Sequence, residues 1–349
     1  MPCLNAAEAL TDARPLKVGL VGCGGRGLGA MKNALDADPG TVVWALADVF
    51  RERIDFGSNL LTEQYGSRVQ LDKSRLFDGL DGYKKLLQTD IDVVLLCTPP
   101  AFRPEHLAAA IDAGKHIYAE KPVAVDVPGV LSVLESARLA KLKNLVILDG
   151  FCWRYDKANE EAHRKLSSGE LGRVLSFDGL YYTTPPKSPL ALDSRPSSDT
   201  DVAWALRNWT AWNWLSGGQF VEQIVHTIDG MVWSMNEQLP LAAFGSGGRA
   251  QRRDDGDVWD HYDVYFEYDH NVAAHISCRQ WVGCHGEIVD RTVCEKGMLV
   301  TPYRPHIQAD KRWRFRGERG NMYADTHVAF YRFLRSGTWK QTLESAEIG

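Results

Sequence analysis

The stretch LKVGLVGCGGRGLGA (residues 16–30) decides how the first half of this chain folds. Its opening residues are mostly apolar and predict a buried β-strand over 16–21. Gly22, Gly24 and Gly27 follow in the spacing G-x-G-x-x-G, and a helical pattern then runs over 28–38. A glycine-rich turn between a buried strand and a helix is the arrangement that receives the pyrophosphate of a dinucleotide.

The second apolar run ends in an acid at the position that such a dinucleotide site requires. TVVWALAD (41–48) predicts a strand that ends in Asp48, 21 residues beyond Gly27. A carboxylate there accepts hydrogen bonds from the adenosine ribose and repels a 2′-phosphate, so we expect NAD as the cofactor. Arg51 follows closely and leaves NADP open, and a tight turn without any ligand is the remaining alternative. Within the loop we also assign Gly25 and Arg26 to the cofactor site.

Further apolar runs over 91–99, 115–120 and 144–148 alternate with helical patterns over 104–114 and 128–143. Continuous apolar strands separated by helices are typical of a parallel sheet covered on both faces. We therefore expect a doubly wound Rossmann domain over residues 1–150.

The pattern changes after residue 150. Strands with alternating polarity are predicted over 173–182, 258–269, 272–281 and 287–302, with helices near 156–168, 219–235 and 323–336. Alternation of this kind indicates a mostly antiparallel sheet with one covered face. The expected fold class is α/β: the Rossmann domain plus a C-terminal α+β domain over residues 151–349, built on a large, mostly antiparallel sheet.

Composition narrows the possible partners. The 349 residues carry a net charge of −5, which argues against a nucleic-acid partner, and no apolar run is long enough to cross a membrane. The seven cysteines are scattered without a CxxC, so we expect reduced cysteines and a cytoplasmic protein. We expect no metal site, because Cys278, Cys284 and His285 match no zinc spacing.

The two ends of the chain leave questions open. The first fifteen residues hold no apolar core of the signal-peptide kind, although export after removal of a leader is not excluded.

A second cluster of functional residue types follows two later strands. CTPPAFRPEH (97–106) ends one strand and AEKP (119–122) ends the next. Ligands of such sheets bind beyond the carboxyl ends of the strands, so these side chains should line one crevice. A surface lysine before a proline is the alternative for Lys121, since lysine is mostly exposed. The residues assigned here to the cofactor site are Thr98, Pro99, His106, Glu120 and Lys121.

Three motifs in order, VGLVGCGGRG (18–27), TPPAFRPEHLAAAIDAGKHIYAEKP (98–122) and GGQFVEQIVHTIDGMVW (217–233), resemble the glucose–fructose oxidoreductase, inositol dehydrogenase and rhizopine-catabolism (Gfo/Idh/MocA) family. The resemblance implies a nicotinamide cofactor, a sugar or cyclitol substrate, and a homodimer or homotetramer that pairs through the open face of its sheet. The chain ends at SAEIG (345–349), about one helix earlier than most members, so either a tail was removed or this member is short.

The resemblance also implies catalytic residues. The lysine of the family's E-K-P motif matches Lys121, and its D-x-x-x-H motif matches Glu222 and His226, with glutamate in place of aspartate. His226 would be the base for the substrate hydroxyl, and Lys121 would stabilise negative charge on the reacting oxygen. Glu222, four residues before His226, would share its helix face and orient Lys121 or bind a substrate hydroxyl. A buried core histidine is the alternative for His226.

Four residues of the second domain are further candidates for contact with a carbohydrate. Arg154 and Tyr155 follow the last Rossmann strand, where substrate contact and domain pairing are equally compatible with the sequence. Asp229 lies one turn beyond His226 and either contacts substrate or pairs locally. Four tryptophans crowd residues 204–214; most should fill a core or an interface, and one or two, Trp209 among them, should line the pocket.

Three functions remain open. The leading hypothesis is an NAD(P)-dependent dehydrogenase or reductase that acts on a carbinol carbon of a sugar, cyclitol or glycoside. The second is a redox-neutral NAD-dependent glycosidase that works by oxidation, elimination, addition and reduction. The third is a regulatory protein that binds NAD without catalysis. The sequence does not reveal which sugar, which carbon or which direction is involved.

Overall fold

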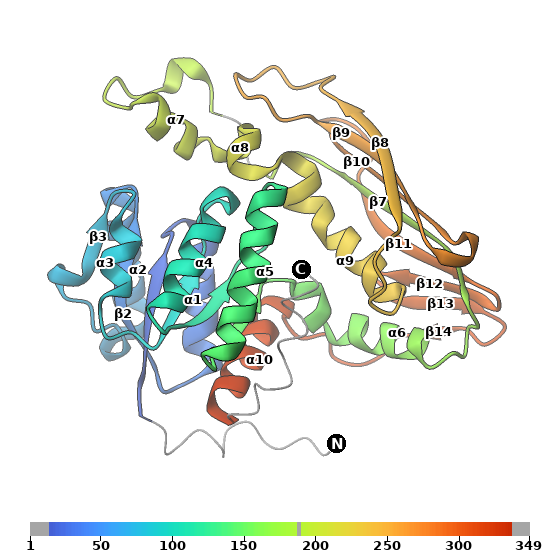
Figure 1. Ribbon diagram of the computed structural model, residues 1–349, viewed down its shortest axis with the longest axis horizontal. Coiled ribbons are helices and arrows are strands. Elements are labelled where there is room, and N and C mark those ends of the chain that lie inside the picture. Colours follow the sequence, from blue (N-terminus) through green and yellow to red (C-terminus); the bar gives the residue numbers. More distant parts are fainter. Residues whose placement is uncertain (1–13, 187–189, 337–349) are drawn as a thin grey trace. The chain divides into compact units, whose positions relative to one another are not determined.

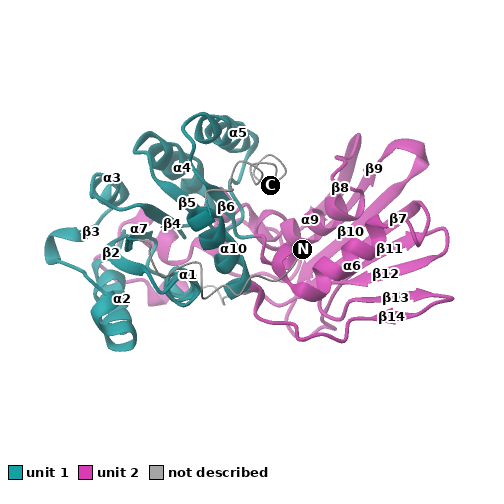
Figure 2. Cartoon of the chain, turned by 90° about the horizontal axis from the view of Figure 1, so that it is seen from below, with its two compact units in different colours: residues 1–150, 323–349 teal, residues 151–322 magenta. Residues whose placement is uncertain are grey.

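The computed structural model describes residues 14–186 and 190–336, so both chain ends discussed above lie outside the described residues. The chain divides into two compact units, which Figure 2 colours separately. Unit 1 comprises Met1–Gly150 and Tyr323–Gly349, and unit 2 comprises Phe151–Met322.

Unit 1 is built on a parallel six-stranded sheet with the strand order β3-β2-β1-β4-β5-β6. This is the order of a dinucleotide-binding fold, whose ligands bind where the chain direction across the sheet reverses, here between β1 and β4. The strands are β1 (Leu16–Val21), β2 (Thr41–Asp48), β3 (Leu76–Asp78), β4 (Val93–Leu96), β5 (His116–Ala119) and β6 (Ile147–Asp149).

Helices cover both faces of this sheet, as the apolar strands require. On one face α3 (Gly82–Leu87), α4 (Arg103–Asp112) and α5 (Val127–Leu142) enclose a core that includes Val94, Leu96 and Ile117. On the other lie α1 (Gly25–Ala37) and α2 (Arg51–Tyr65) (Figure 2). The predicted doubly wound sheet is therefore confirmed, although the sequence analysis did not name the short edge strand β3 or the helices α2 and α3.

The last described helix, α10 (Met322–Ser336), belongs to unit 1 from Tyr323 onward, whereas the sequence analysis placed it in the second domain. The His327 ring stacks on Tyr118 of β5 with 4.0 Å between centroids. Arg335 pairs with the buried Asp38 at 2.7 Å. These buried contacts, rather than proximity along the chain, decide where the helix belongs.

Unit 2 carries an eight-stranded sheet with the order β14-β13-β12-β11-β7-β10-β9-β8. All its neighbouring strands pair antiparallel except β7 with β10, which are parallel, so the mostly antiparallel sheet is confirmed. The strands are β7 (Val174–Thr183), β8 (Ala242–Gly248), β9 (His261–Glu267), β10 (Ala273–Gln280), β11 (Glu287–Cys294), β12 (Gly297–Thr301), β13 (His306–Ala309) and β14 (Trp313–Arg314).

Two helices, α6 (Lys157–Ser167) and α9 (Val225–Ser234), pack on one face of this sheet (Figure 1). In β10 every second side chain is buried on that side, including Ile276 and Cys278. Between β7 and α9 lie two short helices, α7 (Asp201–Arg207) and α8 (Asn213–Ser216), which carry Trp204 and Trp214 of the tryptophan cluster.

The described residues show neither a membrane-spanning helix nor a cluster of metal ligands. No helix among them is long and apolar enough to span a bilayer. No group of three or more His, Cys, Asp or Glu side chains among them could hold a metal ion. None of the six cysteines that the structure describes forms a disulfide.

Candidate active site

The glycine loop leads from β1 into α1, and each of its three motif glycines has a different surrounding. Gly22 adopts a φ of +96°, which favours glycine. A methyl group on Gly27 would overlap the carbonyl oxygen of Gly22, so helix and strand meet closely here. A methyl group on Gly24 would meet no atom of the described chain within 4 Å. Gly22 and Gly27 are thus required by the fold, whereas Gly24 leaves open space in front of the loop.

The loop also presents the beginning of α1. The helix starts at Gly25, and no side chain of the described residues caps it. Uncapped backbone N–H groups at a helix start attract anions, because they carry the positive end of the helix dipole. The open space at Gly24 and the uncapped helix together fit the pyrophosphate of a dinucleotide.

Asp48 is buried at the carboxyl end of β2, where it accepts hydrogen bonds from the backbone N–H of Cys23 at 2.7 Å and of Phe50 at 2.9 Å. Burial raises the pKa of Asp48 above its usual value. Arg53, and not Arg51, is the cation beside it, with 3.9 Å between Nη1 and Oδ1, while Arg51 pairs with Asp55. Arg53 is therefore the residue that bears on the choice between NAD and NADP.

Thr98 and Pro99 follow β4 at the same sheet edge. The Thr98 hydroxyl lies 3.3 Å from Nδ1 of His106, whose ring packs on Tyr83 with 4.0 Å between centroids. Burial lowers the pKa of His106 to about 3, so the imidazole is neutral. His106 is thus a buried side chain next to Thr98, and its contact with a cofactor stays a prediction.

Arg103, which the sequence analysis did not single out, links the segments that follow β4 and β5 by hydrogen bonds. Its side chain is buried and donates hydrogen bonds to the carbonyls of Thr98, Glu120 and Pro122, the last at 2.8 Å. Two of these carbonyls flank Lys121. Burial lowers the pKa of Arg103 to about 10. The signal was present in AFRPEH, but an arginine at a helix start reads as a surface residue until its burial is known.

Glu120 and Arg26 pair with each other at 2.7 Å, which joins the glycine loop to the end of β5. Burial alone would lower the pKa of Arg26, but the Glu120 carboxylate more than offsets it and raises the pKa above its usual value. Lys121 follows at this edge as a half-buried residue. The structure thus brings Thr98, Glu120 and Lys121 to the carboxyl ends of the neighbouring strands β4 and β5.

In unit 2 the predicted base, His226, is buried in the first turn of α9. Its ring stacks on Trp153, with 4.8 Å between centroids and 23° between planes. Phe151 meets the same ring edge-on at 6.0 Å. The rings of Trp153 and Phe151 together fix the plane of the imidazole, as a positioned acid–base group requires.

Glu222 lies in a π-helical turn, Phe220–Ile224, that leads into α9. The sequence analysis expected regular α-helix here, and π-helical turns are rare and frequent at functional sites. Glu222 lines a narrow recess together with Gln219, Thr210 and Arg252. Glu222 therefore reaches a polar cavity one turn before His226.

Arg154 and Asp229 form an internal ion pair at 2.8 Å, and Arg154 also pairs with Glu237 at 2.7 Å. Burial raises the pKa of Asp229 to about 6, although Arg154 acts in the opposite direction. The local pairing left open for Asp229 is thus present. Tyr155 is half-buried at the end of the short helical turn Cys152–Tyr155, which also holds Arg154. Trp209 is half-buried at the start of a second such turn, Trp209–Ala211.

The sequence analysis did not single out Asp290, a buried acidic residue of unit 2. Asp290 on β11 is 1% exposed, and burial raises its pKa well above the usual value. A methyl group on Gly230 of α9 would lie 2.9 Å from its carboxyl oxygen. The alternation of EIVDRTVC shows that Asp290 shares a face with Thr292, but not that α9 covers that face.

Each of the two units matches a known family model. Residues 16–147 match the family model described as an oxidoreductase family with an NAD-binding Rossmann fold, and residues 159–323 match the GFO/IDH/MocA C-terminal domain. Among solved structures, levoglucosan dehydrogenase in complex with NADH has a TM-score of 0.72 and 21% identity, covering 96% of each chain.

Two curated relatives show the range of activities. The dTDP-3,4-didehydro-2,6-dideoxy-alpha-D-glucose 3-reductase of Actinomadura kijaniata is 29% identical over 52% of this chain and 49% of its own. Inositol 2-dehydrogenase 2 of Saccharopolyspora erythraea is 27% identical over 61% of this chain and 57% of its own. The chain thus spans about half the length of the curated relatives it matches. With a family model matched by each unit, the chain belongs to the Gfo/Idh/MocA family of oxidoreductases.

Proposed function

We propose that this protein is an NAD(P)-dependent oxidoreductase that transfers a hydride to or from a carbinol carbon of a sugar or cyclitol. The observation that carries the proposal is the open space at Gly24 in front of the uncapped start of α1. Membership in an oxidoreductase family and relatives named as a sugar reductase and an inositol dehydrogenase support it.

The residues present fit the cofactor. The N–H groups at the start of α1 would hold the pyrophosphate, and Asp48 would hold the adenosine ribose. Two lone pairs of the Asp48 carboxylate are taken by backbone N–H groups, which leaves acceptor capacity for ribose hydroxyls. A bound nicotinamide supplies the hydride acceptor or donor. Asp48 favours NAD, and Arg53 keeps NADP open.

Two side chains would act on the substrate. The ammonium group of Lys121 donates a hydrogen bond to the reacting oxygen and stabilises alkoxide character on it. The imidazole of His226, oriented by Trp153, accepts the hydroxyl proton during oxidation and returns it during reduction. The roles of Lys121 and His226 rest on their chemistry and on their match to the family motifs.

Replacing Lys121 tests the proposal. We expect Lys121→Met to lower the rate of NADH formation from glucose, myo-inositol or levoglucosan by about 100-fold or more, as loss of one oxyanion donor does. Cofactor affinity, measured by quenching of tryptophan fluorescence, should stay within a few-fold. The matched control is Lys141→Met, at an exposed position of α5. Turnover that survives Lys121→Met would remove this residue from the mechanism.

We also propose a cytoplasmic homodimer or homotetramer. The lack of disulfides among the six described cysteines supports a reducing compartment. One face of the unit 2 sheet is covered by α6 and α9, and the other carries side chains such as Leu180, Tyr182 and Tyr265 that are only half-buried within this chain. Pairing through that face would cover them. Light scattering after size exclusion measures the mass, and a monomer would contradict the proposal.

A further inference from the structure

Unit 2 holds adjoining cavities that the proposed chemistry does not use. One, of about 460 Å³, lies between Pro185, Arg252 and Val282. A second, of about 450 Å³, is lined by Trp204, Trp212 and Trp214. Leu192 and Asp255 stand in both walls, so the two cavities adjoin. We call the two cavities, together with the recess at Glu222, the unit 2 groove.

The recess connects the groove to the turn that precedes His226. It measures about 10 Å³ and shares Arg252 and Gln280 with the first cavity. Glu222 and Gln219, both from the segment leading into α9, form its opposite wall. The groove therefore runs from the neighbourhood of the proposed base to the tryptophan cluster, and each of its larger cavities has the size of a ligand pocket (roughly 300–1,000 Å³).

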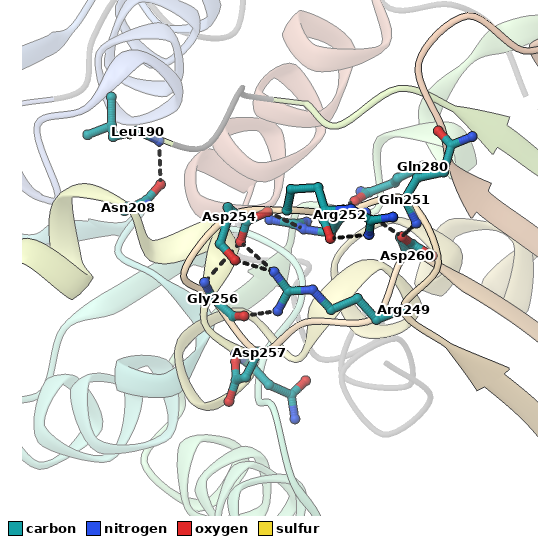
Figure 3. A network of polar contacts seen from close by, with 12 residues as sticks. Leu190, Asn208, Arg249, Gln251, Arg252, Asp254, Gly256, Asp257, Asp260 and Gln280 are labelled. Atoms are coloured by element: carbon teal, nitrogen blue, oxygen red, sulfur yellow. Dashed lines mark hydrogen bonds and ion pairs between the residues drawn. The ribbon is translucent and has the colours of Figure 1, made fainter. Parts of the chain in front are cut away.

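Arg252 is held in place at the polar end of the groove (Figure 3). Asp260 accepts hydrogen bonds from the backbone N–H groups of Ala250, Gln251 and Arg252 at 2.7–3.0 Å. Asp254 accepts from Nε of Arg252 at 2.8 Å. The Arg252 side chain is 6% exposed, so its position is set before any ligand arrives.

Two polar atoms at this end lack a partner in the described part of the chain: Nη2 of Arg252, a donor, and Oε1 of Gln219, an acceptor. Both residues line the recess, and Gln219 is 2% exposed. A buried polar group without a partner costs free energy unless a water or a ligand satisfies it. A donor and an acceptor among the residues that line one recess suit a hydroxyl group, which can accept a hydrogen bond from a donor and donate one to an acceptor.

The other end of the groove is aromatic. Trp214 is 49% exposed and Trp204 is 3% exposed in the same wall. The indole N–H groups of Trp204 and Trp212 are buried without a partner among the residues that the structure describes. Flat rings with free N–H donors suit an aromatic group or the C–H face of a sugar ring.

The charges favour a neutral ligand. Among the described residues that line the larger cavity, the cations Arg252 and Arg253 stand beside the anions Asp254 and Asp255. A phosphate or nucleotide group calls for an excess of positive charge, which these described residues do not supply.

We infer that the unit 2 groove binds the part of the substrate beyond the reacting ring, so that the preferred substrate is a neutral glycoside with an aromatic aglycone or second ring. Sugar hydroxyls bind at Arg252 and Gln219, and the aglycone stacks at Trp214. This inference deepens the proposed function and rests on it for the identity of the reacting ring.

Binding of unreactive probes tests the groove without any hydride transfer. Titration calorimetry of the whole chain compares glucose with α- and β-4-nitrophenyl glucoside, cellobiose and dTDP-glucose, in the absence of cofactor. We expect an aryl glucoside to bind at least about tenfold more tightly than glucose, since stacking and added burial are worth about 1.4 kcal/mol or more. Trp214→Ala should lower that affinity ratio about tenfold, and Gln219→Leu should weaken cellobiose binding.

The matched control is Trp259→Ala, because Trp259 is 47% exposed and outside the groove walls. It should leave the affinity ratio unchanged. Equal binding of glucose and the glucosides, tighter binding of dTDP-glucose, equal effects of Trp214→Ala and Trp259→Ala, or no saturable binding would each overturn the inference. Because no turnover is measured, loss of hydride transfer in another assay would count against the proposed function and not against the groove.

Discussion

Gly24 and Gly27 are three residues apart and are glycine for different reasons. Gly27 has no room for a side chain, because a methyl group would overlap the Gly22 carbonyl oxygen. Gly24 has room and an ordinary φ of −75°, so the fold itself does not require glycine there. The requirement at Gly24 comes from what must approach the loop, and that separates a folding constraint from a binding one.

Alanine at each position therefore has a distinct effect. We expect Gly27→Ala to lower the free energy of unfolding by about 3 kcal/mol, as overpacking against backbone does. Gly24→Ala should leave the melting temperature unchanged and weaken NAD binding at least about tenfold, because the methyl group occupies the approach of the pyrophosphate. Thermal unfolding and fluorescence titration measure the two effects. Destabilisation by Gly24→Ala would show that the space is not open.

Arg103 is a positioning residue for Lys121. We expect Arg103→Met to lower kcat about 10- to 100-fold with a smaller change in KM, because the carbonyls on both sides of Lys121 lose their shared donor. Arg103→Lys should retain more activity, since an ammonium keeps the charge without the planar fork. The control Arg138→Met replaces an exposed arginine paired only with Glu135. A loss of kcat no larger than the unfolded fraction measured by circular dichroism, with KM unchanged, would contradict the positioning role.

At this scale the sequence predicted which residues gather at the sheet edge, but not which of them support the others. Thr98, Glu120 and Lys121 could be placed because parallel strands end at one edge. The sequence analysis assigned His106 to the cofactor site and did not single out Arg103, because the burial of these side chains depends on contacts with Tyr83 and with the segment Glu120–Pro122 that the local pattern does not reveal. The same holds for Arg53, which the spacing in the sequence did not distinguish from Arg51.

At the scale of elements, one histidine of strand β10 forms ion pairs with both neighbouring strands of the sheet. His275 of β10 lies 3.3 Å from Asp178 of β7 and 3.0 Å from Asp263 of β9, and Arg291 also contacts Asp178. Partial burial lowers the pKa of His275, but the two carboxylates outweigh this and raise it above the usual value. The protonated histidine thus links three strands.

The sheet should therefore be more stable in mild acid. The stabilisation by His275 is fully present below its unfolded pKa of about 6.5 and is lost as pH rises through the higher folded value. We expect denaturant melts to show that His275→Asn destabilises at pH 6 by less than about 1 kcal/mol, a difference that shrinks by pH 9. The control His270→Asn replaces an exposed histidine outside this network and should show no such trend. A pH-independent difference would argue against the charge pairs.

At the scale of the whole chain, unit 1 is completed by a segment that follows unit 2. α10 buries Phe330 and Tyr331 and pairs Arg335 with Asp38, whose side chain is fully buried. No periodicity within residues 323–336 reveals this destination, because the helix is amphipathic and would suit any apolar surface.

Breaking that ion pair should weaken unit 1. We expect Arg335→Met to cost about 3–5 kcal/mol, because it leaves a carboxylate buried without its partner. Hydrogen exchange should rise in α1 and β2, next to Asp38, before it rises in the unit 2 sheet. Arg332→Met, at an exposed position of the same helix, is the control. Equal exchange in both variants would show that Arg335 contributes nothing.

The local order of residues alone determined the central strands and the helices α1, α4 and α5 of unit 1, the glycine loop and the class of chemistry. These follow from repeats of two to four residues and from motifs within one turn, where the chain neighbours are also the spatial neighbours. Only the tertiary structure decided that α10 completes unit 1, that Arg103 holds the carbonyls around Lys121, and that the tryptophans and Arg252 line one groove. Each of these depends on which distant segments exclude water from one another, and that is set by packing rather than by sequence distance.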